Sequence, residues 1–295
     1  MTLLHQRAQT EISGLSIKSK VSGVWESILP HVKAGGTWKP VRNVHTKVAG
    51  TWEVTYRHEY VYTFDAGVHT DVDLNLASLG LDKFNKVRIV IPADASLVAS
   101  STSLYALRTG TGYGSTLTIE NNGVILGRGG NGGGGGSGYS YNEVHGPSGG
   151  TAGGPAIYIE CDVTIDNNGT ISGGGGGGSG GNGAVKVGTG YYAGGGGGGG
   201  RPYGAAGTSP RYTAGTYFYG SNGAAGTLTA AGAGGAGGSG AGGYAGAGGS
   251  GGAVGSSGGN SGQGGGSISF DSVNGYGGAA GTTYVNAGTF TVIQA

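Results

Sequence analysis

Acidic, histidine and serine side chains could bind a metal ion or catalyse a reaction, and each of these functions requires a particular spacing. Asp71-x-Asp73-x-Asn75 has the opening spacing of an EF-hand calcium loop, but Leu76 stands where that loop needs glycine and Asp82 where it needs glutamate. The six histidines show no metal-ligand spacing such as His-x-x-x-His. Polar strand faces and solvated histidines explain these residues better than a metal site, so we expect no metal ion.

Candidate catalytic groups are also poorly spaced for catalysis. Glu160, Asp162 and Asp166 differ by even steps and share one strand face, whereas a glycosidase needs two carboxylates that face each other across a cleft. The Gly-x-Ser-x-Gly matches lie inside glycine tracts and do not join a buried strand to a helix, and no Gly-Lys-Ser/Thr phosphate loop occurs. The single cysteine, Cys161, excludes an intrachain disulfide. The sequence therefore predicts a protein that is not an enzyme and needs no cofactor.

Composition and charge exclude further classes of partner. Glycine supplies 75 of the 295 residues, hydrophobic residues 36% and charged residues 11%, so neither one large apolar core nor a polyelectrolyte tail is expected. The formal net charge of +1 gives no reason to expect nucleic acid or an anionic membrane as partner. No apolar run suits a signal peptide or a bilayer span, so we expect synthesis in the producing cell's cytoplasm without a signal peptide and no membrane insertion.

Aromatic residues interrupt the glycine tracts in three segments, 138–149, 184–193 and 201–222. Tyrosine offers a large contact area at little cost in rotamer entropy, and together with Ser, Gly and Asn it is typical of binding loops. A flexible linker would gain nothing from these side chains. We therefore predict a binding surface made of Tyr139, Tyr141, Tyr191, Tyr192, Tyr203, Tyr212, Tyr217, Phe218 and Tyr219.

The glycine-rich region, residues 127–281, must hold those loops. Every third residue from Gly234 to Gly258 is glycine, which is the period of a polyproline-II helix. No proline follows Pro210, and this argues against a collagen triple helix. We predict a bundle of polyglycine-II helices within one chain, cross-linked by backbone hydrogen bonds and carrying loop insertions. A flexible glycine linker is the alternative.

Short strands flank and interrupt the glycine. Residues 59–126 alternate apolar and polar side chains, as expected of β-strands. Their last part, a hairpin-like unit around Asn122-Gly123, recurs 46 residues later at 164–172, and both copies lead into glycine. The repeat indicates one folded architecture. The fold class is therefore mainly β and irregular with almost no α-helix, and residues 282–295 are predicted to be a C-terminal return strand.

The N-terminal part, residues 1–58, contains a degenerate repeat centred on Trp25, Trp38 and Trp52, which are 13 and 14 residues apart. This spacing fits one short strand and a turn for each copy. A unit of this size has a thin core and usually needs a partner to be stable. We interpret residues 1–58 as a small β docking module, with the three tryptophans as attachment residues.

The Asn-Asn-Gly units that run into glycine resemble a known family. Asn121–Asn131 and Asn167–Gly183 are similar to the glycine-rich tip adhesins of T-even-type phage tail fibres and related tail proteins, and the resemblance covers roughly residues 66–295. It implies a virion protein at the tip of a tail fibre or baseplate, in which an attachment domain precedes a sandwich of polyglycine-II helices. The distal loops would bind a bacterial outer-membrane protein or surface glycan, and residues 1–58 another phage tail protein.

Two other functions stay open from the sequence. The chain could be a structural tail or baseplate component that joins or plugs other tail proteins without receptor contact. It could also bind ice through a flat Ala/Ser face along 232–257, although the tyrosine loops fit that function poorly. The sequence allows either a monomer or a homotrimer.

Overall fold

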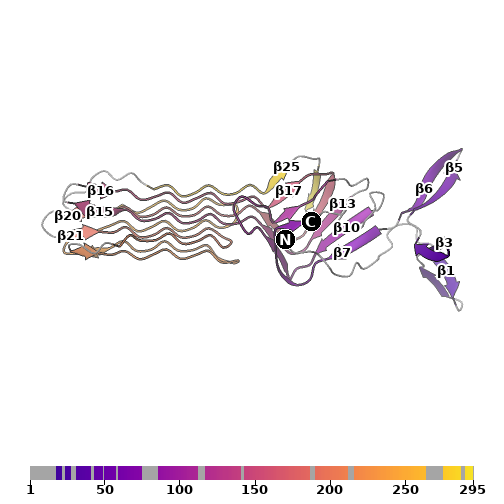
Figure 1. The fold of residues 1–295 in the computed structure, drawn as a ribbon, viewed down its shortest axis with the longest axis horizontal. Coiled ribbons are helices and arrows are strands. Elements are labelled where there is room, and N and C mark those ends of the chain that lie inside the picture. The colour runs from indigo at the N-terminus through magenta and orange to yellow at the C-terminus, as the bar shows by residue number, and fades with distance from the viewer. Residues whose placement is uncertain are drawn as a thin grey trace.

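The computed structural model shows an elongated molecule in which all regular secondary structure of the described residues is β-strand. Three hairpins lie at one end, a strand-rich region follows, and long extended segments lead to a second group of short strands at the far end (Figure 1). None of the described residues form a helix long and apolar enough to span a bilayer. The structure describes residues 18–21, 24–27, 31–40, 43–48, 50–57, 59–74, 86–111, 117–140, 143–186, 190–211, 216–263, 275–286 and 290–294.

The strand-rich region is a parallel β-helix with three faces, because the chain visits three parallel sheets in turn. The first sheet has the order β26-β18-β13-β10-β7, the second β19-β14-β11-β8 and the third β25-β17-β12-β9. The strands of the first sheet are β7 (Glu59–Thr63), β10 (Lys86–Ile91), β13 (Leu117–Asn121), β18 (Val163–Asn167) and β26 (Phe290–Gln294). Those of the second are β8 (Gly67–Thr70), β11 (Ala95–Val98), β14 (Val124–Leu126) and β19 (Thr170–Ser172). Those of the third are β9 (Val72–Asp73), β12 (Leu107–Arg108), β17 (Ile157–Ile159) and β25 (Tyr284–Asn286).

The core of the β-helix follows from the alternation in the sequence. Ile89, Ile119 and Ile165 occupy neighbouring register positions on β10, β13 and β18, and all three are fully buried. Leu97 on the second sheet and Leu107 on the third belong to the same hydrophobic cluster. Each such side chain contributes about 1.5–3 kcal/mol of transfer free energy. The β-strands that we predicted in 59–126 are confirmed where the structure describes this part, and they owe their stability to this shared interior.

The repeat of 46 residues is one turn of the β-helix. β13 pairs in parallel with β18, and β14 with β19, so the two copies lie directly on top of each other. The prediction of a hairpin-like unit around Asn122-Gly123 is wrong, because β13 and β14 belong to different sheets and the Asn-Gly sequence turns a corner between them. The strand region also extends beyond residue 126: β17, β18, β19, β25 and β26 complete the same three sheets.

Asparagine side chains stack along that corner. Inside the β-helix, Asn121 Nδ2 donates to Asn167 Oδ1 over 2.6 Å. Outside it, Asn168 Nδ2 donates to Asn122 Oδ1 over 3.2 Å. The inner pair is buried, and the outer pair faces solvent on the side of Asn168. Both pairs are thus hydrogen bonds between two asparagine amides, one buried and one exposed to solvent.

We expect Asn167→Ala to lower the free energy of unfolding by about 1–3 kcal/mol, because the buried amide of Asn121 would lose its acceptor. Asn168→Ala removes the matching exposed contact and should change stability by less than about 0.5 kcal/mol. Urea unfolding of both variants measures the difference. Equal destabilisation by the two substitutions would show that burial of the inner pair has no effect.

We call the bundle of long extended segments the shaft. Two glycine-rich runs, residues 173–183 and 193–200, lie at its centre and are buried along their length. Residues 173–183 exchange backbone hydrogen bonds with six of the described segments, namely 127–136, 148–154, 194–201, 246–255, 256–259 and 275–281. Residues 193–201 do so with 127–136, 173–183, 204–208, 221–226, 232–238 and 246–252. The central runs are therefore enclosed on every side, which explains why they are almost pure glycine.

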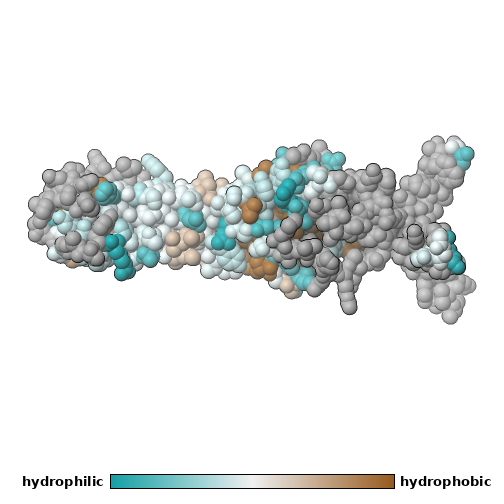
Figure 2. All heavy atoms as spheres, viewed as in Figure 1, coloured by the Kyte–Doolittle hydropathy of each residue, from teal (hydrophilic) through white to brown (hydrophobic). Residues whose placement is uncertain are grey.

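Side chains are excluded wherever two shaft segments touch. A Cβ at Gly177 would overlap the carbonyl oxygen of Asn131, and one at Gly197 would overlap that of Gly178. Outer segments face solvent on one side, and Ala233 and Ala236 are exposed there. Figure 2 shows the result as a pale shaft surface of nearly neutral hydropathy. The glycine of the sequence is thus ordered by backbone contacts, and the flexible-linker alternative is wrong for the described segments.

The three-residue glycine period does not mark one continuous buried face. A turn containing β23 (Ser239–Gly240) and β24 (Gly243–Tyr244) divides the series from Gly234 to Gly258. Before this turn the buried glycines are Gly232, Gly235 and Gly238, which lie outside that series, whereas after it Gly246, Gly249 and Gly252 of the series are buried.

The N-terminal part contains three antiparallel hairpins, so each copy of the tryptophan repeat forms two strands and a turn where the sequence predicted one strand and a turn. Each is a two-stranded sheet that pairs only with itself among the described strands. The side chains of Trp25, Trp38 and Trp52 lie outside the described part, but the backbone register is clear. The strands are β1 (Lys18–Val21), β2 (Val24–Ser27), β3 (His31–Ala34), β4 (Thr37–Pro40), β5 (Asn43–Val48) and β6 (Thr51–Arg57).

Candidate binding tip

The far end of the shaft, which we call the tip, is built from short strands that join outgoing and returning glycine segments (Figure 1). β20 and β21 form an antiparallel pair, and β21 pairs in parallel with β22. In that register Tyr191 lies opposite Tyr217, and Tyr192 opposite Phe218. The tip strands are β15 (Ser137–Ser140), β16 (Glu143–His145), β20 (Ala184–Lys186), β21 (Gly190–Tyr192) and β22 (Tyr217–Phe218), together with β23 and β24.

The inner face of this small sheet forms the core of the tip. The rings of Tyr192 and Phe218 stack with centroids 4.9 Å apart and an angle of 11° between their planes. Ala184 and Ala245 pack against them. Tyr192 is fully buried, and its hydroxyl donates to Gly240 O over 2.8 Å. Tyr192 therefore supports the tip from within, and the structure does not place it on the contact surface that we predicted for it.

The outer face carries a row of three tyrosines. The ring centroids of Tyr191 and Tyr217 are 5.0 Å apart, and those of Tyr217 and Tyr219 are 6.1 Å apart, both pairs stacked. Tyr217 and Tyr191 are partly buried, whereas Tyr219 at the end of the row is 48% exposed. The Tyr217 hydroxyl contacts Gly138 O over 3.4 Å and so links this row to β15. The row joins side chains from two strands that are separate in the sequence, β21 and β22, with Tyr219 directly after β22.

A lysine contact fixes the hairpin of β23 and β24 to the rest of the tip. Lys186 Nζ donates to Ala241 O over 3.0 Å. Cβ atoms at Gly240 and Gly243 would overlap or crowd the rings of Phe218 and Tyr192, so the hairpin backbone lies directly on the aromatic core. The tip thus combines an aromatic core with tyrosines on its outer side, and tyrosine suits recognition by shape and hydrogen bonding.

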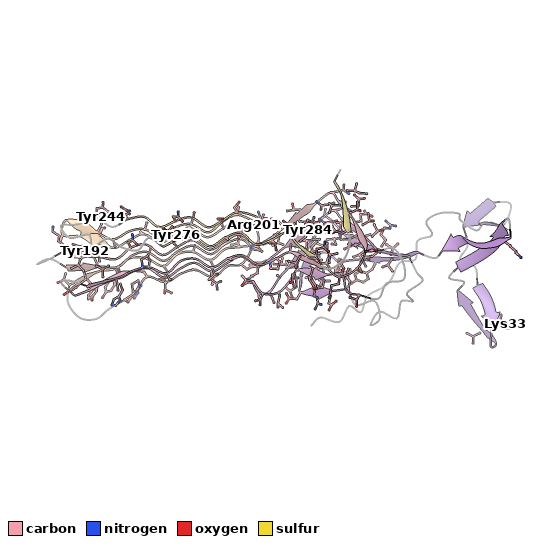
Figure 3. All side chains as sticks on the ribbon, turned by 90° about the horizontal axis from the view of Figure 1, so that it is seen from above. Lys33, Tyr192, Arg201, Tyr244, Tyr276 and Tyr284 are labelled. Atoms are coloured by element: carbon pink, nitrogen blue, oxygen red, sulfur yellow. The ribbon has the colours of Figure 1, made fainter. Side chains whose placement is uncertain are left out.

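Tyr203 is not part of this surface. Segment 202–208 runs parallel to segment 129–135, with Gly129 N donating to Pro202 O and Gly135 N to Thr208 O. Tyr203 therefore lies at the base of the shaft, close to the β-helix, where Arg128 covers its ring at 5.4 Å. Arg201, which is close to Tyr203 in the sequence, is labelled at this end of the shaft in Figure 3. The prediction that 201–222 is one binding segment is wrong, because a complete shaft segment separates its two ends.

Other predicted contact residues are only partly described. The backbone of Tyr139 belongs to β15, but its side chain lies outside the described residues, as do Tyr141 and Tyr212.

Sequence reasoning missed two exposed tyrosines. Tyr244 in β24 is 54% exposed at the tip, and Tyr276 is 70% exposed on the flank of the shaft (Figure 3). The available signal for Tyr244 was that it is the single aromatic residue between Gly234 and Gly258.

Two acidic residues of the β-helix have clear structural partners. Glu160 Oε1 pairs with Arg108 Nη2 over 2.6 Å, and Ser100 hydrogen-bonds to the carboxylate of Asp71. Burial raises the pKa of the Cys161 thiol, an effect that a hydrogen bond to Thr109 partly opposes. The described residues contain no group of three His, Cys, Asp or Glu side chains that could hold a metal ion.

A narrow backbone scaffold with an aromatic tip defines a binding protein of the adhesin type. Comparison with known families is specific: the model of the family described as "Phage tail fibre adhesin Gp38" matches residues 59–295. The chain belongs to this family. It is a non-enzymatic receptor-binding protein of the phage tail fibre.

One solved structure is similar over most of the chain. It is the crystal structure of the gp37-gp38 adhesin tip complex of the bacteriophage S16 long tail fiber, at 27% sequence identity, covering 81% of this chain and 79% of that one, with a TM-score of 0.46. No curated protein matches the chain. The adhesin interpretation of the sequence is confirmed by the family, whereas a purely structural tail component and an ice-binding protein are not supported.

Proposed function

We propose that the adhesin contacts its receptor with the tip, through the outer row of Tyr191, Tyr217 and Tyr219 together with Tyr244. The observation that carries this proposal is the stacked row on the outer face, which ends in the exposed ring of Tyr219. Stacked tyrosines lose little rotamer entropy on binding, because their neighbours already hold them. The partner is a bacterial surface receptor, either an outer-membrane protein or a surface glycan.

The shaft is the second part of the proposal: its segments are polyglycine-II helices that hold the tip rigidly away from the β-helix. The hydrogen bonds support this conformation by their period. Gly130, Gly133 and Gly136 donate to Gly175, Gly178 and Gly181, a step of three residues on both segments. Three residues per turn is the period of the polyproline-II helix, which polyglycine-II shares. A rigid shaft reduces the entropy that binding would otherwise cost.

Attachment to the virion is the third part. We assign it to residues 1–58, which dock onto another tail protein. The hairpins lie at the end of the molecule opposite the tip (Figure 1). Isolated two-stranded hairpins are marginally stable in water, so a partner surface would stabilise them.

Tyr219→Ala is expected to weaken receptor binding by about 30-fold, because aromatic anchors at an interface commonly contribute about 2 kcal/mol or more. The purified chain is added to susceptible cells before phage, and the concentration that blocks half of the adsorption is measured. Tyr276→Ala makes the same change on the flank of the shaft and should block as the wild type does. If both variants block equally well, the outer row is not the contact surface.

The same assay separates the two classes of receptor. Cells treated with protease should lose the capacity to bind the chain if the receptor is an outer-membrane protein. Periodate treatment should abolish binding if the receptor is a glycan. Binding that survives both treatments would contradict the proposed receptor classes.

A further inference from the structure

The outer face of the third sheet of the β-helix carries aromatic rings. Leu107 on β12 and Ile157 on β17 are fully buried in the core. Because neighbouring residues of a strand point to opposite faces, Arg108 and Tyr158 point outward, and the register places them side by side. Tyr105, in the corner before β12, stacks on Tyr158 with ring centroids 4.9 Å apart and an angle of 26° between their planes.

Charged groups lie beside these rings. The Arg108 guanidinium lies 5.5 Å from the centroid of the Tyr158 ring, and its Nη2 donates to Glu160 Oε1 over 2.6 Å. Glu160 is itself fixed, because its Oε2 accepts from Gly110 N over 3.2 Å. Tyr105, Arg108, Tyr158 and Glu160, which we call the flank cluster, therefore hold two rings, a cation and an anion in defined positions.

The flank cluster is accessible to a ligand. The side chain of Arg108 is 45% exposed, and both rings are partly exposed. Leu104, next to Tyr105, is 43% exposed. On the first and second sheets, the outward positions that the structure describes carry no aromatic ring, and Thr118 and Ser96 are examples of what they carry. A turn of this β-helix thus does not require outward rings for its own stability.

This combination of groups suits a saccharide. A sugar ring presents C–H groups on its faces, which stack on an aromatic ring, and hydroxyl groups around its edge. A guanidinium and a carboxylate that are held together offer those hydroxyls charge-assisted hydrogen bonds, which are stronger than neutral ones. The guanidinium of Arg108 has five N–H donors, so the bond to Glu160 leaves donors for a ligand. Groups that are already fixed lose less entropy on binding.

We propose that the flank cluster binds a saccharide of the bacterial surface, as a second contact besides the tip. The shaft sets its height: at the polyglycine-II rise of about 3.1 Å for each residue, segment 174–183 is about 30 Å long. With the tip on a receptor at the membrane, the flank cluster lies within the layer of polysaccharide chains that extend outward from the cell. The site follows from the β-helix alone, and only this height rests on the proposed roles of shaft and tip.

Affinity electrophoresis tests the site directly. The full-length chain runs through gels that contain protein-free polysaccharide, released from the lipopolysaccharide of the susceptible host, and its retardation gives an association constant. The wild type should be retarded, and Tyr105→Ala and Arg108→Ala should each lower the association constant by about 10-fold. If the wild type is not retarded, the inference is overturned.

Two matched variants separate binding from folding in these gels. Tyr105→Phe keeps the stacked ring and should be retarded as the wild type is. Val68→Ala, at a position that is 51% exposed on the outer face of the second sheet, should also bind unchanged. If Tyr105→Phe binds as weakly as Tyr105→Ala, the ring is not the contact and the inference is wrong.

Cells separate the flank cluster from the tip. On cells that carry the polysaccharide, Tyr105→Ala should need about 10-fold more protein than the wild type to block half of the phage adsorption. On mutant cells that lack the polysaccharide but still adsorb the phage, it should block as the wild type does. Equal loss on both kinds of cell would contradict the inference.

Tyr219→Ala distinguishes a failure of this inference from a failure of the proposed function. It should weaken blocking on both kinds of cell and leave retardation in the gels unchanged. If retardation depends on Tyr219 and not on Tyr105, the saccharide binds at the tip and the flank inference fails. If Tyr219→Ala blocks as the wild type does and Tyr105→Ala is impaired, the proposed role of the tip fails and the flank site stands.

Discussion

Gly133→Ala is expected to destabilise the adhesin by about 3 kcal/mol or more, whereas Gly134→Ala, one residue further on, should leave its stability unchanged or slightly higher. A Cβ at Gly133 would overlap Ser148 O, a backbone atom that cannot turn aside. At Gly134 the nearest atom is the side-chain oxygen of Ser148 at 3.5 Å, an ordinary contact distance. The two substitutions are chemically identical and differ only in the face of the shaft segment.

Calorimetry of Gly133→Ala and Gly134→Ala measures the difference in their unfolding temperatures. A segment that could shift freely would relieve the overlap at Gly133, and both variants would then unfold at the same temperature. That outcome would contradict the close backbone packing of segments 127–136 and 148–154. Failure of Gly133→Ala to fold at all would agree with the expectation, provided that Gly134→Ala is produced normally.

Tyr192→Ala is expected to abolish receptor binding, although Tyr192 itself touches no receptor. Removal of a fully buried aromatic side chain typically costs about 3–5 kcal/mol. The tip has a small core, in which Phe218, Ala184 and Ala245 are the neighbours of Tyr192, so the local strands should open. The outer tyrosine row would then lose its support, because Tyr191 and Tyr217 lie on the same two strands as this core.

Tyr192→Phe is the matched control. It keeps the stacked ring and removes only the hydrogen bond to Gly240 O, at a cost of about 0.5–1.5 kcal/mol, so it should still block adsorption. Hydrogen exchange should rise in β20, β21 and β22 of Tyr192→Ala and stay low in β10, β13 and β18. If Tyr192→Ala blocks adsorption as the wild type does, the tip core is not needed for recognition.

Local patterns in the sequence were enough to predict the strands and the order in the glycine. Alternating side chains identify buried strands such as β10 and β18, because one face of a strand must leave water. The Tyr-rich segments around Tyr191 and Tyr217 predict binding loops, because tyrosine offers a large contact area at little cost in rotamer entropy. The repeat around Asn122-Gly123 and the adjoining glycine led to the correct family.

The pairing of distant segments could not be predicted from the same patterns. β18 pairs in parallel with β26, with Val163 opposite Phe290, although the two strands are far apart in the sequence and glycine tracts lie between them. The hairpin-like interpretation of 117–126 was wrong because an Asn-Gly turn fits both a hairpin and the corner of a β-helix. The position of Tyr203 was wrong because composition alone does not show at which end of a glycine segment a turn lies.

The sequence by itself determined which face of each strand avoids water and which part of the chain is rich in glycine, since both are properties of individual residues and their spacing. Only the tertiary structure decided which glycine segments touch each other and which tyrosines meet at the tip. The physical reason is that backbone hydrogen bonds between glycine segments are chemically alike, so local sequence cannot select among partners. That selection comes from the β-helix, which fixes where each glycine segment begins, and from the turns, which fix where it returns.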